Sequence, residues 1–108
     1  MKKNILLKKD KYKSARGGYS RLLNLYCQKC DNLIAEYQKD GPGNLCRLYM
    51  DRIFAPEKLI NLQKQNIKSI SPLKCSKCNV ILGIPYVYEK EKRKAFRIFQ
   101  EALIKKIK

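Results

Sequence analysis

Four of the chain's five cysteines form two Cys-x-x-Cys pairs, Cys27 with Cys30 and Cys75 with Cys78, and the chain contains no histidine. In a short, lysine-rich chain, two such pairs are typical of metal ligands rather than of disulfides. One turn can present two thiolates, and two turns complete the tetrahedral set of four sulfurs that zinc binds. The sequence therefore predicts one structural zinc ion held by these four cysteines.

The residues that surround the two pairs are similar in kind. Short apolar stretches precede and follow each pair, and Asp31 or Asn32 and Asn79 stand where a positive φ is expected, which Asn and Asp tolerate well. In these features residues 22–84 resemble the four-cysteine zinc ribbon, and the resemblance implies a β-hairpin core. The chain departs from the ribbon pattern because neither pair has the form Cys-Pro-x-Cys-Gly. The 44 residues between the pairs also exceed the compact spacing of about 15–20 residues, so we expect an insertion there.

Catalysis is not expected from this set of residues. Four protein thiolates leave a metal ion no open position, and no histidine is available as a general base near neutral pH. Iron is the alternative metal, because rubredoxin-like sites use the same four thiolates, and it would make the protein an electron carrier. We expect the fifth cysteine, Cys46, to be a small buried apolar residue, because it alternates with Leu48 and Met50.

The hydrophobic pattern predicts an α+β fold. Strands are expected over residues 33–38, 45–50 and 80–84, with the first two paired as a hairpin and a short helix over residues 56–67. Residues 89–107 are predicted to form an amphipathic helix, because Phe96, Phe99, Leu103 and Ile107 would share one face of it. We therefore expect a basic arm over residues 1–18, a zinc-ribbon-like domain over residues 19–88, and a C-terminal helix over residues 89–108 packed on that domain.

The charge of the chain indicates the class of its partner. Lysine and arginine number 25 against 9 acidic residues, a formal net charge of +16. Residues 1–21 carry +7 and residues 89–108 carry +5, which places +12 of the total in 41 residues at the two ends. A charge gathered in this way favours binding to a polyanion over a uniformly solvated surface.

We therefore predict a non-enzymatic protein that binds RNA or DNA with little sequence specificity, with RNA or a ribonucleoprotein favoured. The alternative partner is an acidic protein surface, and no small-molecule substrate is expected. No apolar run approaches the length of a membrane span or of a signal peptide, so we expect a cytoplasmic location. The residues predicted to contact phosphates are Lys8, Lys9, Lys11, Lys13, Arg16, Arg21, Lys90, Lys94, Arg97 and Lys105.

Overall fold

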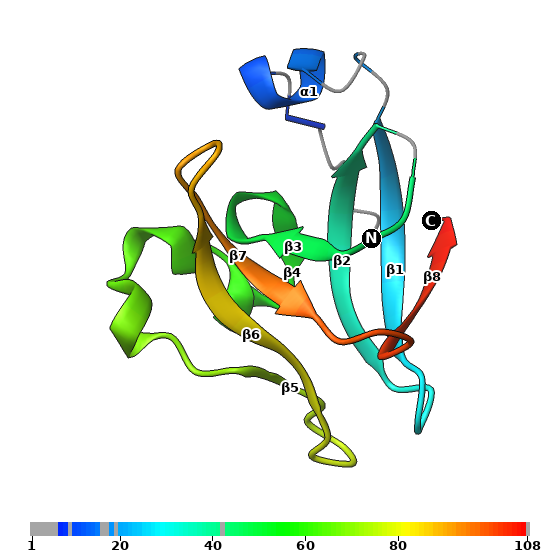
Figure 1. Cartoon of the computed structure of the whole chain (residues 1–108). Coiled ribbons are helices and arrows are strands. Elements are labelled where there is room, and N and C mark those ends of the chain that lie inside the picture. Colours follow the sequence, from blue (N-terminus) through cyan, green and yellow to red (C-terminus); the bar gives the residue numbers. More distant parts are fainter. Residues whose placement is uncertain (1–6, 9, 16–17, 19, 42, 108) are drawn as a thin grey trace.

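Two four-stranded antiparallel sheets make up most of the structure, a computed structural model that describes residues 7–8, 10–15, 18, 20–41 and 43–107 (Figure 1). The first sheet has the order β4-β2-β1-β8, with bounds Ile53–Ala55, Leu33–Asp40, Ser20–Cys27 and Leu103–Ile107. The second sheet has the order β3-β7-β6-β5, with bounds Arg47–Tyr49, Arg93–Ile98, Ile81–Tyr88 and Leu73–Lys74.

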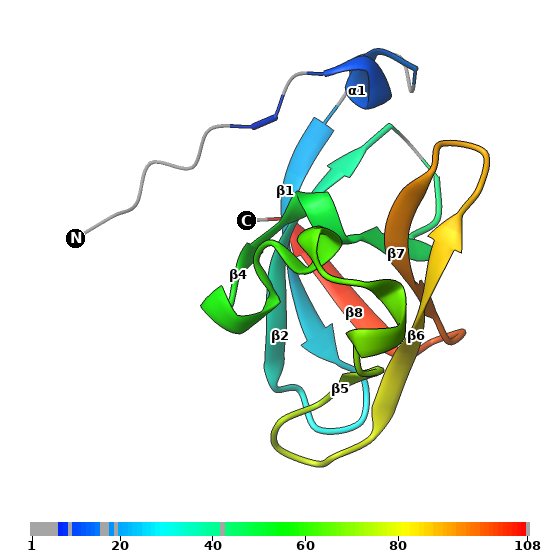
Figure 2. The ribbon, with the colours of Figure 1, turned by 90° about the vertical axis from the view of Figure 1, so that its left-hand side faces the viewer.

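The chain passes between the two sheets several times. It builds β1 and β2 in the first sheet, β3 in the second, β4 in the first, β5 to β7 in the second, and finally β8 in the first. Figure 2 shows β8 lying beside β1, although the two strands are far apart in sequence. Both sheets therefore depend on pairings between distant segments.

Helical structure is minor in the described residues. One short helix, α1 (Lys11–Ala15), precedes β1, and a single 3₁₀ turn, η1 (Met50–Arg52), links β3 to β4. Three further 3₁₀ turns follow β4: η2 (Glu57–Leu59), η3 (Leu62–Lys64) and η4 (Ile67–Ser69). They replace the continuous helix predicted over residues 56–67. None of the helices among the described residues has the length and apolar character needed to cross a membrane.

The hydrophobic core lies between the sheets. In β1 the side chains of Leu23, Leu25 and Cys27 are buried while their neighbours are only half-buried, as expected for a strand with one face on the core. Leu48 of β3 and Phe96 of β7 are directly opposite one another in the second sheet and belong to the same buried cluster. Residues from both sheets thus form one core.

The predicted C-terminal helix is wrong, and with it the α+β fold class. Residues 93–98 form β7 and residues 103–107 form β8, so the chain is mostly antiparallel sheet. Two residues in left-handed conformations, Lys92 (φ 51°) and Glu101 (φ 60°), mark the turns before each strand. The residues of this segment favour a helix locally, but long-range pairing of β7 with β6 and of β8 with β1 prevails.

The predicted hairpin between residues 33–38 and 45–50 is also wrong. The strand over residues 33–38 exists as the greater part of β2, but its partners are β1 and β4. β3 instead crosses to the second sheet and pairs with β7, where Arg47 lies opposite Arg97. Only three residues, Met50–Arg52, separate β3 from β4, so the chain changes sheets through a single 3₁₀ turn.

Candidate metal centre and basic cavity

The two Cys-x-x-Cys pairs occupy equivalent turns, one from each sheet. The first joins β1 to β2, and the second joins β5 to β6. In the first turn the N–H of Asp31 donates to the carbonyl of Cys27 at 2.8 Å, and in the second the N–H of Asn79 donates to that of Cys75 at 2.9 Å. Asp31 and Asn79 both have φ 64°, which confirms the positive φ expected after each pair.

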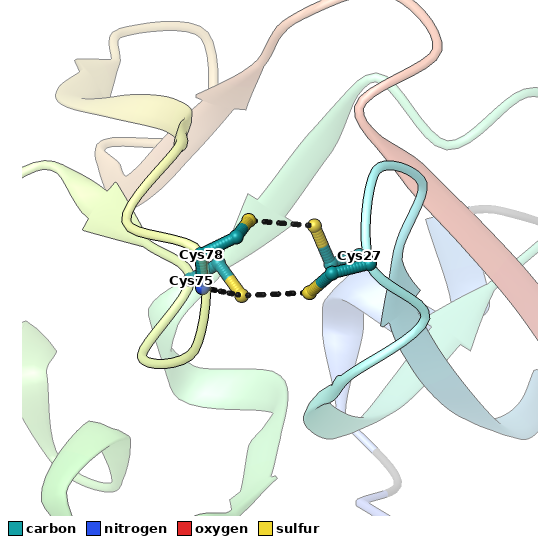
Figure 3. Close-up of side chains that lie close together, drawn as sticks. Cys27, Cys75 and Cys78 are labelled. Carbon is teal, nitrogen blue, oxygen red and sulfur yellow. Dashed lines mark hydrogen bonds between the residues drawn. The ribbon is translucent and has the colours of Figure 1, made fainter.

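The four sulfur atoms converge between the turns (Figure 3). Cys27 Sγ lies 3.7 Å from Cys78 Sγ, Cys30 Sγ lies 3.5 Å from Cys75 Sγ, and all four atoms lie within 4.8 Å of one another. A tetrahedral ion with bonds of about 2.3 Å to sulfur would separate its ligands by about 3.8 Å, whereas a disulfide needs about 2.05 Å. The spacing suits one metal ion, and the prediction that these four cysteines form one group is confirmed.

Hydrogen-bond donors point at this cluster. The N–H of Cys78 lies 3.5 Å from Cys75 Sγ, and Asn32 Nδ2 lies 3.7 Å from the same sulfur. Desolvation opposes ionisation of Cys75, but backbone N–H groups of Cys78 and Lys77 outweigh it and lower the pKa of the thiol to about 6. Donors aimed at sulfur favour the thiolate form, which is the form that binds metals.

The pKa of the Cys30 thiol is shifted in the opposite direction to that of Cys75. The backbone N–H of Asn32 favours its thiolate, but desolvation and hydrogen bonds to the other three sulfurs together raise the pKa of Cys30 to about 12. Four thiolates in so small a volume repel one another unless a cation neutralises them. The donor set therefore fits a divalent metal ion, which removes this repulsion when it binds.

Cys46 is not part of the group, and its expected burial is wrong. Its side chain is exposed, and it lies in the loop before β3. The alternation that predicted its burial holds for Leu48, which is buried in β3, but the strand begins only at Arg47. The backbone carbonyl of Cys46 accepts a hydrogen bond from the N–H of Ile98 at 3.0 Å, which fixes the loop beside β7.

Two of the predicted phosphate contacts meet at one cavity of about 420 Å³. Arg21 of β1 and Lys105 of β8 line it together with Lys39 of β2. Arg21 lies opposite Lys39 in the β1–β2 ladder, and Lys105 lies opposite Leu25 in the β1–β8 ladder, so all three project from the same face of the first sheet. No acidic residue lines this cavity in the described part of the chain.

The remaining predicted contacts lie on several other surfaces. Lys94 is held by the fold, because its ammonium group donates to the carbonyls of Gln63 at 2.8 Å and Gln65 at 2.5 Å. Lys8 donates to the carbonyl of Asp51, and Lys11 lies 5.2 Å from the ring of Tyr12. The predicted C-terminal helix that would have carried Lys90, Lys94, Arg97 and Lys105 does not exist. Lys90 is exposed in the β6–β7 turn, Arg97 is exposed on β7, and Lys9, Arg16 and the side chain of Lys13 lie outside the described residues.

Sequence reasoning missed Lys39 and Arg47. Lys39 was missed because the strand over residues 33–38 was ended too early, whereas β2 runs to Asp40. Arg47, which lines a further cavity with Tyr86 and Tyr88, was missed because the pairing of β3 with β7 leaves no local signal in the sequence. The one usable signal in the sequence was the spacing of Tyr86 and Tyr88, which lie two residues apart in β6 and therefore project from the same face of the sheet.

Comparison of the chain with protein-family models, with curated proteins and with solved structures found no match in any of the three. None of them identifies a zinc ribbon.

Proposed function

We propose that Cys27, Cys30, Cys75 and Cys78 hold one structural zinc ion. The support is a donor set of four thiolates at tetrahedral spacing, contributed equally by the two sheets. Four protein ligands fill the coordination sphere, so the ion would stabilise the fold rather than activate a water molecule. Elemental analysis of the purified protein distinguishes zinc from iron, and iron would instead support electron transfer.

We further propose that the protein binds nucleic acid and is not an enzyme. The observation that carries this proposal is the basic cavity, defined here as the cavity lined by Arg21, Lys39 and Lys105. Three cations from three adjacent strands face one space that no acidic residue lines among the described residues, on a chain of net charge +16. Phosphate oxygens are the groups that such a cluster attracts most strongly, and the attraction carries no base specificity.

The test is the salt dependence of binding to single-stranded RNA and to double-stranded DNA. Affinity should fall steeply with salt, with a log–log slope of about 0.7 per phosphate contact for single strands. Arg21→Gln and Lys105→Gln should each lower the affinity and reduce the salt slope by the contribution of about one phosphate contact. Both effects should be the same for nucleic acids of different sequence. Lys64→Gln is the matched control, because Lys64 is an exposed lysine of η3 that does not line the basic cavity.

Absence of binding to any nucleic acid at about 50 mM salt, where electrostatic attraction is strong, would contradict this function. Binding to poly-glutamate under the same conditions would then indicate an acidic protein partner.

A further inference from the structure

Arginine and tyrosine side chains form a column along the outer face of the second sheet, with Tyr12 of α1 at one end. The guanidinium carbon of Arg93 lies 3.9 Å from the ring centroid of Tyr12 and 3.7 Å from that of Tyr49. The ring of Tyr49 meets that of Tyr88 edge to face at 6.0 Å, and Arg47 lies 4.1 Å from the centroid of Tyr88. The column therefore runs from Tyr12 at one end to Arg47 at the other.

The two ends of this column differ in how they are neutralised. Arg93 is buried and forms ion pairs with Asp51 at 2.6 Å and Glu91 at 3.2 Å. Arg47 and its cross-strand neighbour Arg97 form no ion pair within the described residues, and Arg97 is exposed. The Arg47 end thus carries uncompensated positive charge beside exposed aromatic surface.

A cavity of about 620 Å³ lies at the Arg47 end. It is lined by both arginines and three aromatic side chains, Tyr86, Tyr88 and Phe99, and by no acidic residue of the described chain. Arg47, Arg97, Tyr86 and Tyr88 share the outer face because they occupy matching positions in the β3–β7 and β7–β6 ladders. Phe99 has 45% of its surface exposed, although it follows the end of β7 directly.

This cavity and the basic cavity both adjoin a third cavity, as the lining residues that they share with it indicate. The third cavity has a volume of about 510 Å³. It shares Lys105 with the basic cavity, and it shares four lining residues with the cavity at the Arg47 end: Cys46, Ile98, Phe99 and Gln100. The three together form a furrow around the loop before β3. Five basic residues and one acidic residue, Glu101, line this furrow in the described part of the chain: Arg21, Lys39, Arg47, Arg97 and Lys105.

We propose that the furrow binds single-stranded nucleic acid, with bases stacked at Tyr86 and Phe99 and the backbone directed by Arg97 toward Lys105. Aromatic faces bind only bases that are free of a duplex stack, and a basic groove beside them follows the backbone. Arginine also stacks on bases, so Arg47 would extend its own column by one more ring. This inference rests on the proposed nucleic-acid binding and adds the form of the ligand.

The test compares an oligo-dT strand of about 20 nucleotides with a duplex of the same length, each titrated at several salt concentrations. The wild-type protein should bind the single strand more tightly. Tyr86→Ala and Phe99→Ala should weaken single-strand binding about 5- to 150-fold, as loss of one stacked base does, with an unchanged salt slope. Arg97→Gln should weaken binding and reduce the slope by about 0.7.

Conservative variants separate stacking from general apolar contact. Tyr86→Phe and Phe99→Tyr keep a ring and should keep wild-type affinity, whereas Phe99→Leu keeps only apolar volume and should not. Ile60→Ala is the control, because Ile60 is an exposed apolar residue outside the furrow. Circular dichroism and metal content of each variant establish that it is folded.

The possible failures are distinguishable. Equal binding of strand and duplex that depends on Arg21 but not on Tyr86 or Phe99 would overturn the stacking proposal and leave nucleic-acid binding standing. No binding of either probe would overturn both. Equal losses from Phe99→Leu and Phe99→Ala support stacking, while retention of affinity in Phe99→Leu would contradict it.

Discussion

Phe96 and Phe99 lie three residues apart in the chain but in contrasting surroundings. Phe96 is 1% exposed within the core, and Phe99 is 45% exposed at the furrow. Phe96→Ala should therefore lower the free energy of unfolding by about 3–5 kcal/mol, the cost of emptying a buried aromatic site. Phe99→Ala should lower it by less than about 1 kcal/mol, since exposed side chains contribute little. Urea denaturation of the metal-loaded protein measures both values.

A reversed order of these two losses would mean that the chain over residues 89–107 packs differently. Losses of about 3 kcal/mol or more from both variants would mean that Phe96 and Phe99 are both buried on one apolar face, which contradicts the strand assignment. The pair of variants is thus an internal control, because both remove the same group from neighbouring positions.

The candidate site illustrates what single residues reveal in a sequence. The cysteine pairs were predictable because each is a local turn whose spacing alone specifies two ligands, and Asp31 and Asn79 support the same turns. The basic cavity was not predictable, because Arg21, Lys39 and Lys105 meet only through the β1–β2 and β1–β8 ladders. The site could not be predicted because its residues are far apart in the sequence, although their residue types suit phosphate binding.

Several elements of the first sheet are joined through one buried arginine. Arg52 of η1 is 1% exposed, and its guanidinium group donates to Asp40 at 2.9 Å and to Asp10 at 2.6 Å. Asp40 also accepts hydrogen bonds from Ser20 at 2.6 Å and Gln38 at 2.8 Å. The network links the residue before α1 to β1, β2 and η1, so it fixes Asp10 to the sheet.

This network predicts a pH dependence with a definite sign. Burial raises the pKa of Asp40, but the hydrogen bonds from Ser20, Gln38 and Arg52 outweigh it and hold the pKa below its usual value. A carboxylate with a lowered pKa in the folded state stabilises the protein above the unfolded value of about 3.9, and this contribution is lost as pH falls through the folded value.

Asp40→Asn should therefore cost about 3–5 kcal/mol of unfolding free energy, as removal of one partner of a buried ion pair does. The difference from wild type should stay constant between about pH 8 and 5, since Asp40 remains ionised there. Glu57→Gln, which removes an exposed carboxylate of η2, is the matched control. A difference that shrinks between pH 7 and 5 would show a raised pKa instead.

At the scale of secondary structure, the local sequence pattern of residues 89–107 gave the wrong prediction. Residues 89–107 contain neither glycine nor proline and are rich in Lys, Arg and Glu, so local propensity favours a helix. They form strands instead, because the edges of β6 and β1 are available for pairing. β7 pairs with β6 through six residues, and β8 pairs with β1 through five. The strands at residues 33–38 and 80–84 were predictable, because each carries the apolar content of a strand between turn residues.

At the scale of the whole molecule, the cysteine cluster connects the two sheets at their turns (Figure 3). Metal binding to such a site contributes directly to folding, because the site does not exist in the unfolded chain. Cys30→Ser and Cys78→Ser are the sharpest variants, since these two side chains are only half-buried and their loss disturbs the core least. Each should lose the metal and most of its stability, and each kcal/mol lost lowers the thermal midpoint by about 4–8 °C.

Cys46→Ser is the control for these variants and should retain one metal ion per chain, because Cys46 lies outside the cluster. Metal content by elemental analysis and thermal unfolding by circular dichroism give the two readouts. A cluster variant that loses its metal and keeps its full thermal midpoint would contradict a structural role for the ion.

The order in which strands alternate between the sheets also has a consequence for synthesis of the protein. β1 ends at Cys27 and its outer partner β8 begins at Leu103, 76 positions later. At about 5–20 residues per second, a ribosome needs about 4–15 s to produce that interval. During this time one edge of β1 has no partner strand, and until Cys78 has been made the thiols of Cys27 and Cys30 lack their counterparts. The four-cysteine cluster can therefore be completed only after Cys78 emerges, and closure of the first sheet follows later still.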